Sequence, residues 1–180
     1  MYRRLLFTAV IAALTAAPAL ASLKVGATAP DFKAQASLGG NVFDFNLADA
    51  LKKGPVVLYF YPAAFTRGCT IEAHTFADAM DKFTALHATV IGVSADPIAK
   101  LQDFSKSECR SKFAVAADPS MQVIKAYDAV YAPHPTIADR TSYVIAPNGK
   151  ILATLTDMSH PQDHVTNALQ VLQQYEASNH

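Results

Sequence analysis

The chain has 180 residues, of which 51% are hydrophobic and 17% are charged, and its 15 basic and 15 acidic residues cancel. This length and composition predict one globular domain with a full core. The balanced charge offers no basic surface for nucleic acid and no cationic anchor for a membrane, so we expect small, uncharged substrates.

Residues 1–21 have the pattern of a secretory signal peptide. Two arginines near the start precede an apolar run, 5–17, and Ala19-Leu20-Ala21 supplies a small-x-small cleavage site. An uncleaved membrane anchor is the alternative, but about 13 apolar residues fall short of the roughly 20 that span a bilayer. We therefore expect export to the periplasm and a mature domain of residues 22–180, with no stable membrane insertion after cleavage. The sequence leaves the Sec and twin-arginine routes both open.

Apolar runs alternate with amphipathic stretches along the mature chain. The expected elements, in chain order, are a hairpin of strands 31–36 and 41–45, strand 56–61, helix 70–86, strand 89–94, helix 97–107, strand 115–117, helix 120–127, strands 142–146 and 151–156, and helix 160–175. The Gly39-Gly40 pair lies between the first two strands, and the Asn148-Gly149 pair between the last two strands favours a hairpin turn. This order predicts an α/β domain with a mixed central sheet flanked by helices.

Cys69 is a candidate reactive residue because it lies at the N-terminal end of a predicted helix, shortly after the apolar run 56–61. Backbone N–H groups and the positive end of the helix dipole point at a side chain in that place, which favours a thiolate, the reactive form of cysteine. The position of Cys69 therefore predicts a nucleophile site.

The spacing around this cysteine resembles a known family. Pro62, Thr66 and Cys69 follow the pattern of a proline, three residues, a threonine, two residues and a cysteine that marks the peroxiredoxins of the AhpC/TSA superfamily. The wider segment, 60–73, looks most like the bacterioferritin-comigratory or PrxQ branch, and the segment 140–151 is similar to a later family segment that an arginine opens. The resemblance implies a thioredoxin-like fold with an added N-terminal hairpin. It also implies a thiol-dependent peroxidase, a monomer or weak dimer without cofactor, which reduces hydrogen peroxide and organic hydroperoxides with electrons from a thioredoxin-like or small-thiol reductant.

The resemblance also implies roles for individual residues. Cys69 would attack the peroxide, while Thr66 Oγ and the Cys69 N–H would hold the peroxide in line with the sulfur. Arg140 would add positive charge beside the thiolate, Pro62 would shield the sulfur, and Glu72 would support an arginine. Each residue has a plainer interpretation: Thr66 as an N-cap, Arg140 as a surface residue at a strand start, and Glu72 as a solvated glutamate. Arg67 is a rival cation, which we expect to face solvent.

Cys109 is the second cysteine, and its role stays open. Many members of the branch carry a resolving cysteine five residues after the first, but that position is His74 here. We favour Cys109 as the resolving cysteine, which would condense with an oxidised Cys69 to a disulfide. The alternatives are a permanent structural disulfide between the two cysteines and one-cysteine chemistry with an inert, buried Cys109.

Two other functional classes are weighed against the peroxidase. A thioredoxin-type oxidoreductase needs Cys-x-x-Cys, and Thr66 occupies the position of the first cysteine. A copper-binding module would place more ligands around the loop than Cys69 with His74 or His134. His160 and His164 lie one helical turn apart, but we expect a solvated pair and assign no metal.

Overall fold

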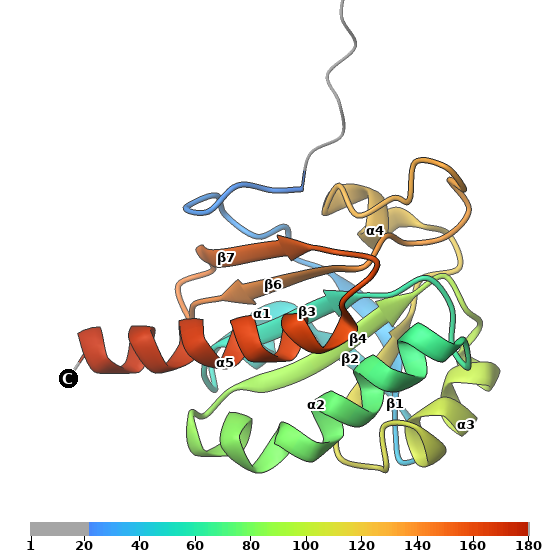
Figure 1. The fold of residues 1–180 in the computed structure, drawn as a ribbon, viewed down its shortest axis with the longest axis horizontal. Coiled ribbons are helices and arrows are strands. Elements are labelled where there is room, and N and C mark those ends of the chain that lie inside the picture. Colours follow the sequence, from blue (N-terminus) through green and yellow to red (C-terminus); the bar gives the residue numbers. More distant parts are fainter. Residues whose placement is uncertain (1–21, 180) are drawn as a thin grey trace, which may run out of the picture.

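The computed structural model describes residues 22–179, so the predicted signal peptide lies outside the described residues. Seven strands and five helices follow one another along this part of the chain (Figure 1). They are β1 (Lys33–Leu38), β2 (Asn41–Asn46), α1 (Leu47–Leu51), β3 (Val56–Phe60), α2 (Arg67–Ala85), β4 (Thr89–Ser94), α3 (Ile98–Ser107), β5 (Ala114–Ala117), α4 (Gln122–Ala126), β6 (Thr141–Ile145), β7 (Ile151–Thr156) and α5 (Pro161–Ser178).

The strands form one mixed sheet in the order β2-β1-β5-β4-β3-β6-β7. The central strands β5, β4 and β3 are parallel, and the βαβ connections between them carry α2 and α3. At one side the hairpin β6–β7 adds antiparallel to β3, and at the other side the N-terminal hairpin β1–β2 adds antiparallel to β5. The expected mixed sheet and both hairpins are confirmed.

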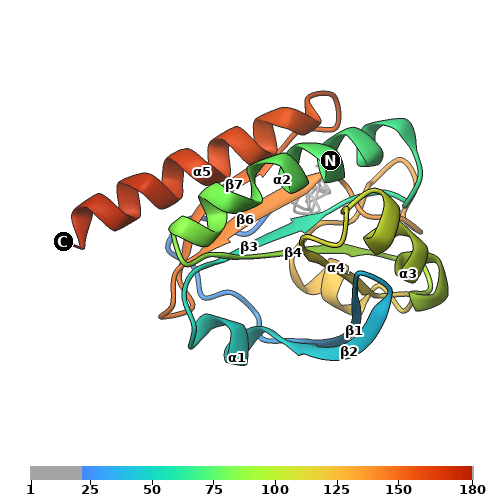
Figure 2. The same cartoon turned by 90° about the horizontal axis from the view of Figure 1, so that it is seen from below.

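Both faces of the sheet are covered, and the alternation of β3 separates them. Val56, Leu58 and Phe60 point into a core that includes residues of α1 and α4. Val57 and Tyr59 point into the opposite core, which includes residues of α2, α3 and α5. Figure 2 shows α2 and α5 on one side of the sheet and α1 on the other. Both cysteines belong to the α2–α3–α5 side.

The structure differs most from the sequence-based expectations at two helices, while several other ends lie one to three residues from the expected bounds. Helix α1 is not among the expected elements; it is a single turn, closed by the Asn46 side chain, which accepts a hydrogen bond from the Asp49 amide. Five residues are too few to display a helical period, so no amphipathic pattern predicts it. Helix α2 begins at Arg67 instead of residue 70, which places Cys69 inside the first turn. None of the helices within residues 22–179 is long and apolar enough to cross a bilayer.

Candidate active site

Cys69 is the third residue of α2, and its side chain is 1% exposed. The first hydrogen bond of this helix runs from the Thr70 amide to the Thr66 carbonyl, at 2.9 Å. The Cys69 amide precedes that bond, so it belongs to the group of first-turn N–H donors that a helix leaves for other acceptors. The sulfur and a free amide therefore share the N-terminal end of one helix.

The loop between β3 and α2 is fixed from the neighbouring strand. The Ala64 amide donates to Asp96 Oδ2 at 2.7 Å, and Lys100 Nζ donates to the other oxygen of the same carboxylate at 2.7 Å. Phe65 adopts a positive φ of 68°, which is unusual for a bulky residue. Its ring packs edge-to-face against the ring of Phe104, with the ring centroids 5.2 Å apart. These contacts hold the chain reversal that delivers Thr66 to the start of α2.

Arg140 brings a buried cation to Cys69 from the start of β6. Its Nη2 lies 3.6 Å from Cys69 Sγ, while Nη1 donates to Glu72 Oε2. Its Nε donates to the carbonyl of Met158 at 3.4 Å, and only 3% of the residue is exposed. A Cβ at Gly68 would lie 2.8 Å from Nη2, so the glycine makes room for the guanidinium. The surface interpretation of Arg140 is wrong.

Glu72 is fully buried one helical turn after Cys69, so its interpretation as a solvated glutamate is also wrong. Its Oε1 has no hydrogen-bond partner among residues 22–179. The pKa of Glu72 is raised to about 8, because burial raises it more than contact with Arg140 lowers it. The carboxyl group touches Arg140 from the side of α2 and so fixes one end of the guanidinium.

Two further residues of the predicted site, Thr66 and Pro62, lie on the loop before α2, and the rival cation Arg67 begins that helix. Thr66 occupies the N-cap position of α2, but its hydroxyl donates to the Ala63 carbonyl at 2.9 Å and caps no helix amide. The lone pairs of that oxygen are therefore available to accept a hydrogen bond. Pro62 is half-buried, and Arg67 is exposed, as expected for a residue that faces solvent.

Cys109 lies just beyond the last residue of α3 and is fully buried. Burial raises the pKa of the Cys109 thiol, and the neighbouring carboxylate of Glu108 raises it further. Both cysteines are free thiols. Two side-chain contacts join the turn that carries Cys109 to α2: His74 Nε2 lies 2.8 Å from Glu108 Oε2, and Arg110 pairs with Asp78.

Sequence reasoning missed two supporting residues. Asp96 holds the loop before α2, and its only signal is its place directly after β4, where polar residues often turn the chain. His164 is buried, with Nδ1 at 2.9 Å from Ser142 Oγ and Nε2 at 3.0 Å from the Asp157 carbonyl, so the expected solvated pair with His160 is wrong for His164. Within residues 22–179 no three histidine, cysteine or carboxylate side chains gather closely enough to hold a metal ion.

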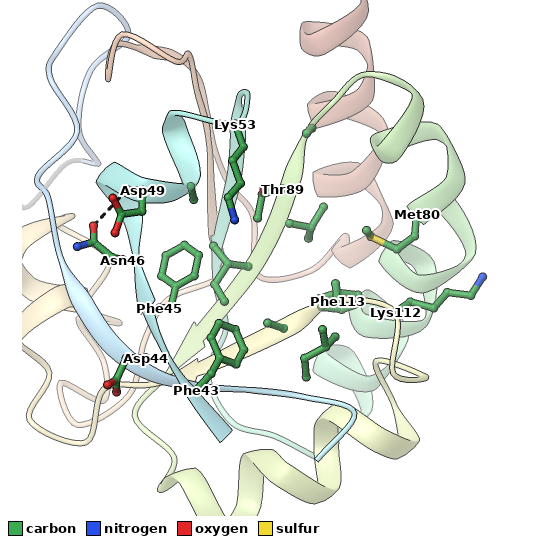
Figure 3. A pocket seen from close by; sticks show the side chains of 16 residues that line it. Phe43, Asp44, Phe45, Asn46, Asp49, Lys53, Met80, Thr89, Lys112 and Phe113 are labelled. Carbon is green, nitrogen blue, oxygen red and sulfur yellow. Dashed lines mark hydrogen bonds between the residues drawn. The ribbon is translucent and has the colours of Figure 1, made fainter. Parts of the chain in front are cut away.

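A cavity of about 400 Å³ lies elsewhere in the fold, between β2 with α1 and the first residues of β4 and β5 (Figure 3). Phe43 and Phe45 point into it, and the carboxylate of Asp44 points away. Its lining carries both signs of charge, including Asp49 and Lys53, and contains neither Cys69 nor Arg140. The site at Cys69 is therefore separate from this cavity.

Comparison with known proteins agrees with this geometry. The model of the AhpC/TSA family matches residues 25–154, which include Cys69 and Arg140. A chloroplastic peroxiredoxin Q of Oryza sativa is 32% identical over 148 residues, 82% of this chain, and this chain spans 66% of the length of that relative. A peroxiredoxin Q of Sedum lineare is 31% identical over 153 residues, which cover 85% of this chain and 80% of the relative.

The solved structures give the same result. The crystal structure of peroxidoxin BcpB from Mycobacterium tuberculosis is 30% identical and superposes with a TM-score of 0.76 over 84% of this chain and 97% of that one. The likeness to this structure confirms the thioredoxin-like fold that the sequence predicted. With the family model covering the fold from β1 into β7, the chain belongs to the AhpC/TSA family of peroxiredoxins, and its relatives are of the peroxiredoxin Q branch.

Proposed function

We propose that the chain is a thiol-dependent peroxidase that reduces hydrogen peroxide and organic hydroperoxides, with Cys69 as the nucleophile. The observation that carries the proposal is the contact between Arg140 Nη2 and Cys69 Sγ at 3.6 Å, with the guanidinium held on its other side by Glu72. A cation fixed beside a sulfur at a helix N-terminus favours the thiolate over the thiol. Family membership supports the same activity.

In the first step, the Cys69 thiolate attacks the nearer oxygen of the peroxide. An S–O bond forms, the O–O bond breaks, and the leaving oxygen takes a proton to become water or an alcohol, so Cys69 becomes a sulfenic acid and the peroxide is reduced by two electrons. Negative charge moves from the sulfur to the leaving oxygen during this step. Donors that already point at that region stabilise the transition state without reorganisation.

Three groups of the site suit this charge movement. Thr66 Oγ1, whose proton is engaged with Ala63, can accept a hydrogen bond from the peroxide O–H and so orient the peroxide. The Cys69 amide and the Arg140 guanidinium are donors for the oxygens. Pro62, half-buried beside them, would limit the access of water to the sulfur.

In the second step, we propose that Cys109 resolves the sulfenic acid. The Cys109 sulfur attacks the Cys69 sulfur, a disulfide forms, and the sulfenic oxygen leaves as water; an external thioredoxin-like or small thiol then returns both cysteines to thiols. Cys109 is fully buried at the end of α3, so this step requires the turn after α3 to open. The competing route leaves Cys109 inert and lets a small thiol reduce Cys69 directly.

We also propose that the mature protein acts in the periplasm after removal of residues 1–21. This rests only on the pattern of two arginines, an apolar run and Ala19-Leu20-Ala21. Intact mass of the protein recovered from the periplasmic fraction of a Gram-negative host tests it. A mass that begins at Ser22 supports export with cleavage, and a full-length cytoplasmic product contradicts it.

The deciding experiment treats the reduced mature protein with one equivalent of hydrogen peroxide, quenches within a second, and records intact mass and free thiols. Wild type should lose both thiols and two mass units, and Cys109→Ser should trap a sulfenic acid on Cys69. Cys69→Ser should lose peroxide turnover altogether, because the remaining thiol within residues 22–179, Cys109, is fully buried and has a raised pKa. Appreciable turnover by Cys69→Ser would falsify the proposal, whereas loss of only the Cys69 thiol in wild type would replace the two-cysteine route by the one-cysteine route.

A further inference from the structure

His164 is a buried histidine whose two ring nitrogens are both engaged. Asp157 contributes a backbone carbonyl oxygen, which can only accept, so His164 Nε2 must carry the proton of that 3.0 Å hydrogen bond. In the neutral imidazole, which burial favours, the other nitrogen, Nδ1, accepts from Ser142 Oγ at 2.9 Å. The two contacts fix the tautomer of this neutral ring and join α5 to β6 and to the loop before α5.

The same loop holds Arg140. The Asp157 amide donates to the Arg140 carbonyl at 3.1 Å, and the next residue, Met158, accepts from Arg140 Nε at 3.4 Å. His164 therefore anchors residue 157 on one side, and residues 157 and 158 hold the backbone and side chain of Arg140 on the other. One more contact links Arg140 Nη2 to Cys69 Sγ.

We propose that His164 is a positioning residue for the peroxidase reaction, which in its neutral form fixes residues 157 and 158 so that Arg140 reaches the Cys69 sulfur. This inference rests on the proposed function of Cys69. His164 contacts neither the sulfur nor a peroxide, so its effect passes through Arg140.

The charges around His164 explain why its neutral form matters. Arg140 faces it from the start of β6, Asp157 from the loop, and Asp163 from its own helix, while Glu72 and Cys69 lie on the far side of Arg140. Burial lowers the pKa of His164, the hydrogen bond to Asp157 opposes this shift, and the positive charge of Arg140 adds to the lowering. An imidazolium here would repel Arg140 and would reverse the hydrogen bond to Ser142, whose hydroxyl oxygen would then accept from Nδ1–H.

Two substitutions separate the effect of the two His164 hydrogen bonds from the effect of protonating the His164 ring. His164→Gln can keep both bonds, because its amide oxygen accepts from Ser142 and its amide nitrogen donates to Asp157, but it cannot titrate. His164→Leu removes both bonds. His160→Gln is the matched control, since His160 lies one turn earlier, is largely exposed, and its ring Nδ1 lies 2.8 Å from the carboxylate of Asp157, not from its carbonyl.

The measurement is the second-order rate of Cys69 thiol loss to hydrogen peroxide, by quenched single turnover with intact mass, from pH 4.5 to 7.5. Near pH 7 we expect His164→Gln and His160→Gln to stay within about twofold of wild type and His164→Leu to be at least about fivefold slower, since small displacements of a catalytic group are costly. Toward the acid end, the rate of wild type should fall more steeply with decreasing pH than the rate of His164→Gln, because only wild type can protonate residue 164.

Identical slopes for wild type and His164→Gln, together with a His164→Leu variant that reacts as fast as wild type, would overturn the inference. An equal loss in His160→Gln would also overturn it, because the effect would then belong to the loop in general. If His164→Leu fails to fold, as thermal unfolding would reveal, the slopes of wild type and His164→Gln decide. Failure of the proposed function looks different: Cys69 would not lose its thiol to peroxide in any variant.

Discussion

Cys69 and Cys109 are equally buried, at 1% and 0% exposure, and lie in the same apolar cluster, yet their electrostatic surroundings are opposite. Cys69 sits in the first turn of α2, where helix amides are free and Arg140 approaches the sulfur. Cys109 sits just past the last turn of α3, at the negative end of a helix and next to the carboxylate of Glu108.

The difference teaches that burial alone does not make a cysteine inert. For Cys109 no buried cation offsets the loss of water, and its pKa rises. For Cys69 the fold brings Arg140 and Glu72 to the sulfur as a pair, so that a buried positive charge is itself stabilised. In the proposed reaction, the first cysteine reacts in place and the second reacts after its turn opens.

The largest expected effect concerns the access of Cys109. In the Cys69→Ser variant, alkylation of Cys109 by iodoacetamide at pH 8 should be at least about 100-fold slower in the folded protein than in denaturant, because only the rarely opened turn exposes the thiol. Timed quenching and intact mass give both rates. Alkylation at comparable rates would break the comparison, since Cys109 would then be reactive without any opening.

The next effect concerns the cation. Arg140→Ala should slow the oxidation of Cys69 by hydrogen peroxide at least tenfold, roughly 1.4 kcal/mol of barrier or more, because the charge beside the sulfur and the leaving oxygen is lost. Arg67→Ala is the control, since Arg67 is close in sequence and exposed. A loss smaller than tenfold in the first variant with a larger loss in the second would transfer the role to Arg67.

The strongly patterned parts of this fold are predictable from the sequence. Apolar runs gave β3, β4, β6 and β7, and the Gly39-Gly40 and Asn148-Gly149 pairs marked both hairpins, with positive φ at three of these residues: Gly39, Gly40 and Gly149. Helix α1 is not predictable in this way, because a single turn is too short to show a helical period of apolar residues. The start of α2 was placed three residues late because Arg67 and Gly68 carry no apolar signal.

The site is less predictable, because its pairs join distant parts of the chain. Glu72 and Arg140 are 68 residues apart, and only the resemblance to a family brought Arg140 to Cys69 in advance. No local pattern shows that Asp96 reaches back to the Ala64 amide. The spacing of His160 and His164 predicted two equivalent histidines, but His160 precedes the first turn of α5, whereas His164 lies inside the helix on its buried side.

The smallest expected effect concerns the two side-chain contacts that join the Cys109 turn to α2. His74–Glu108 and Asp78–Arg110 are partly exposed, so each should contribute little to the closed turn. Glu108→Gln should nevertheless speed formation of the proposed Cys69–Cys109 disulfide about two- to fivefold, because it weakens the contact with His74 and removes the negative charge that disfavours the Cys109 thiolate.

Asp103→Asn is the matched control, because Asp103 is an exposed α3 carboxylate with only a loose pairing to Lys106. The measurement is the loss of the second thiol after one equivalent of peroxide, timed separately from the first. An unchanged or slower second step, with Cys69 oxidation intact, would mean that opening of this turn does not limit resolution.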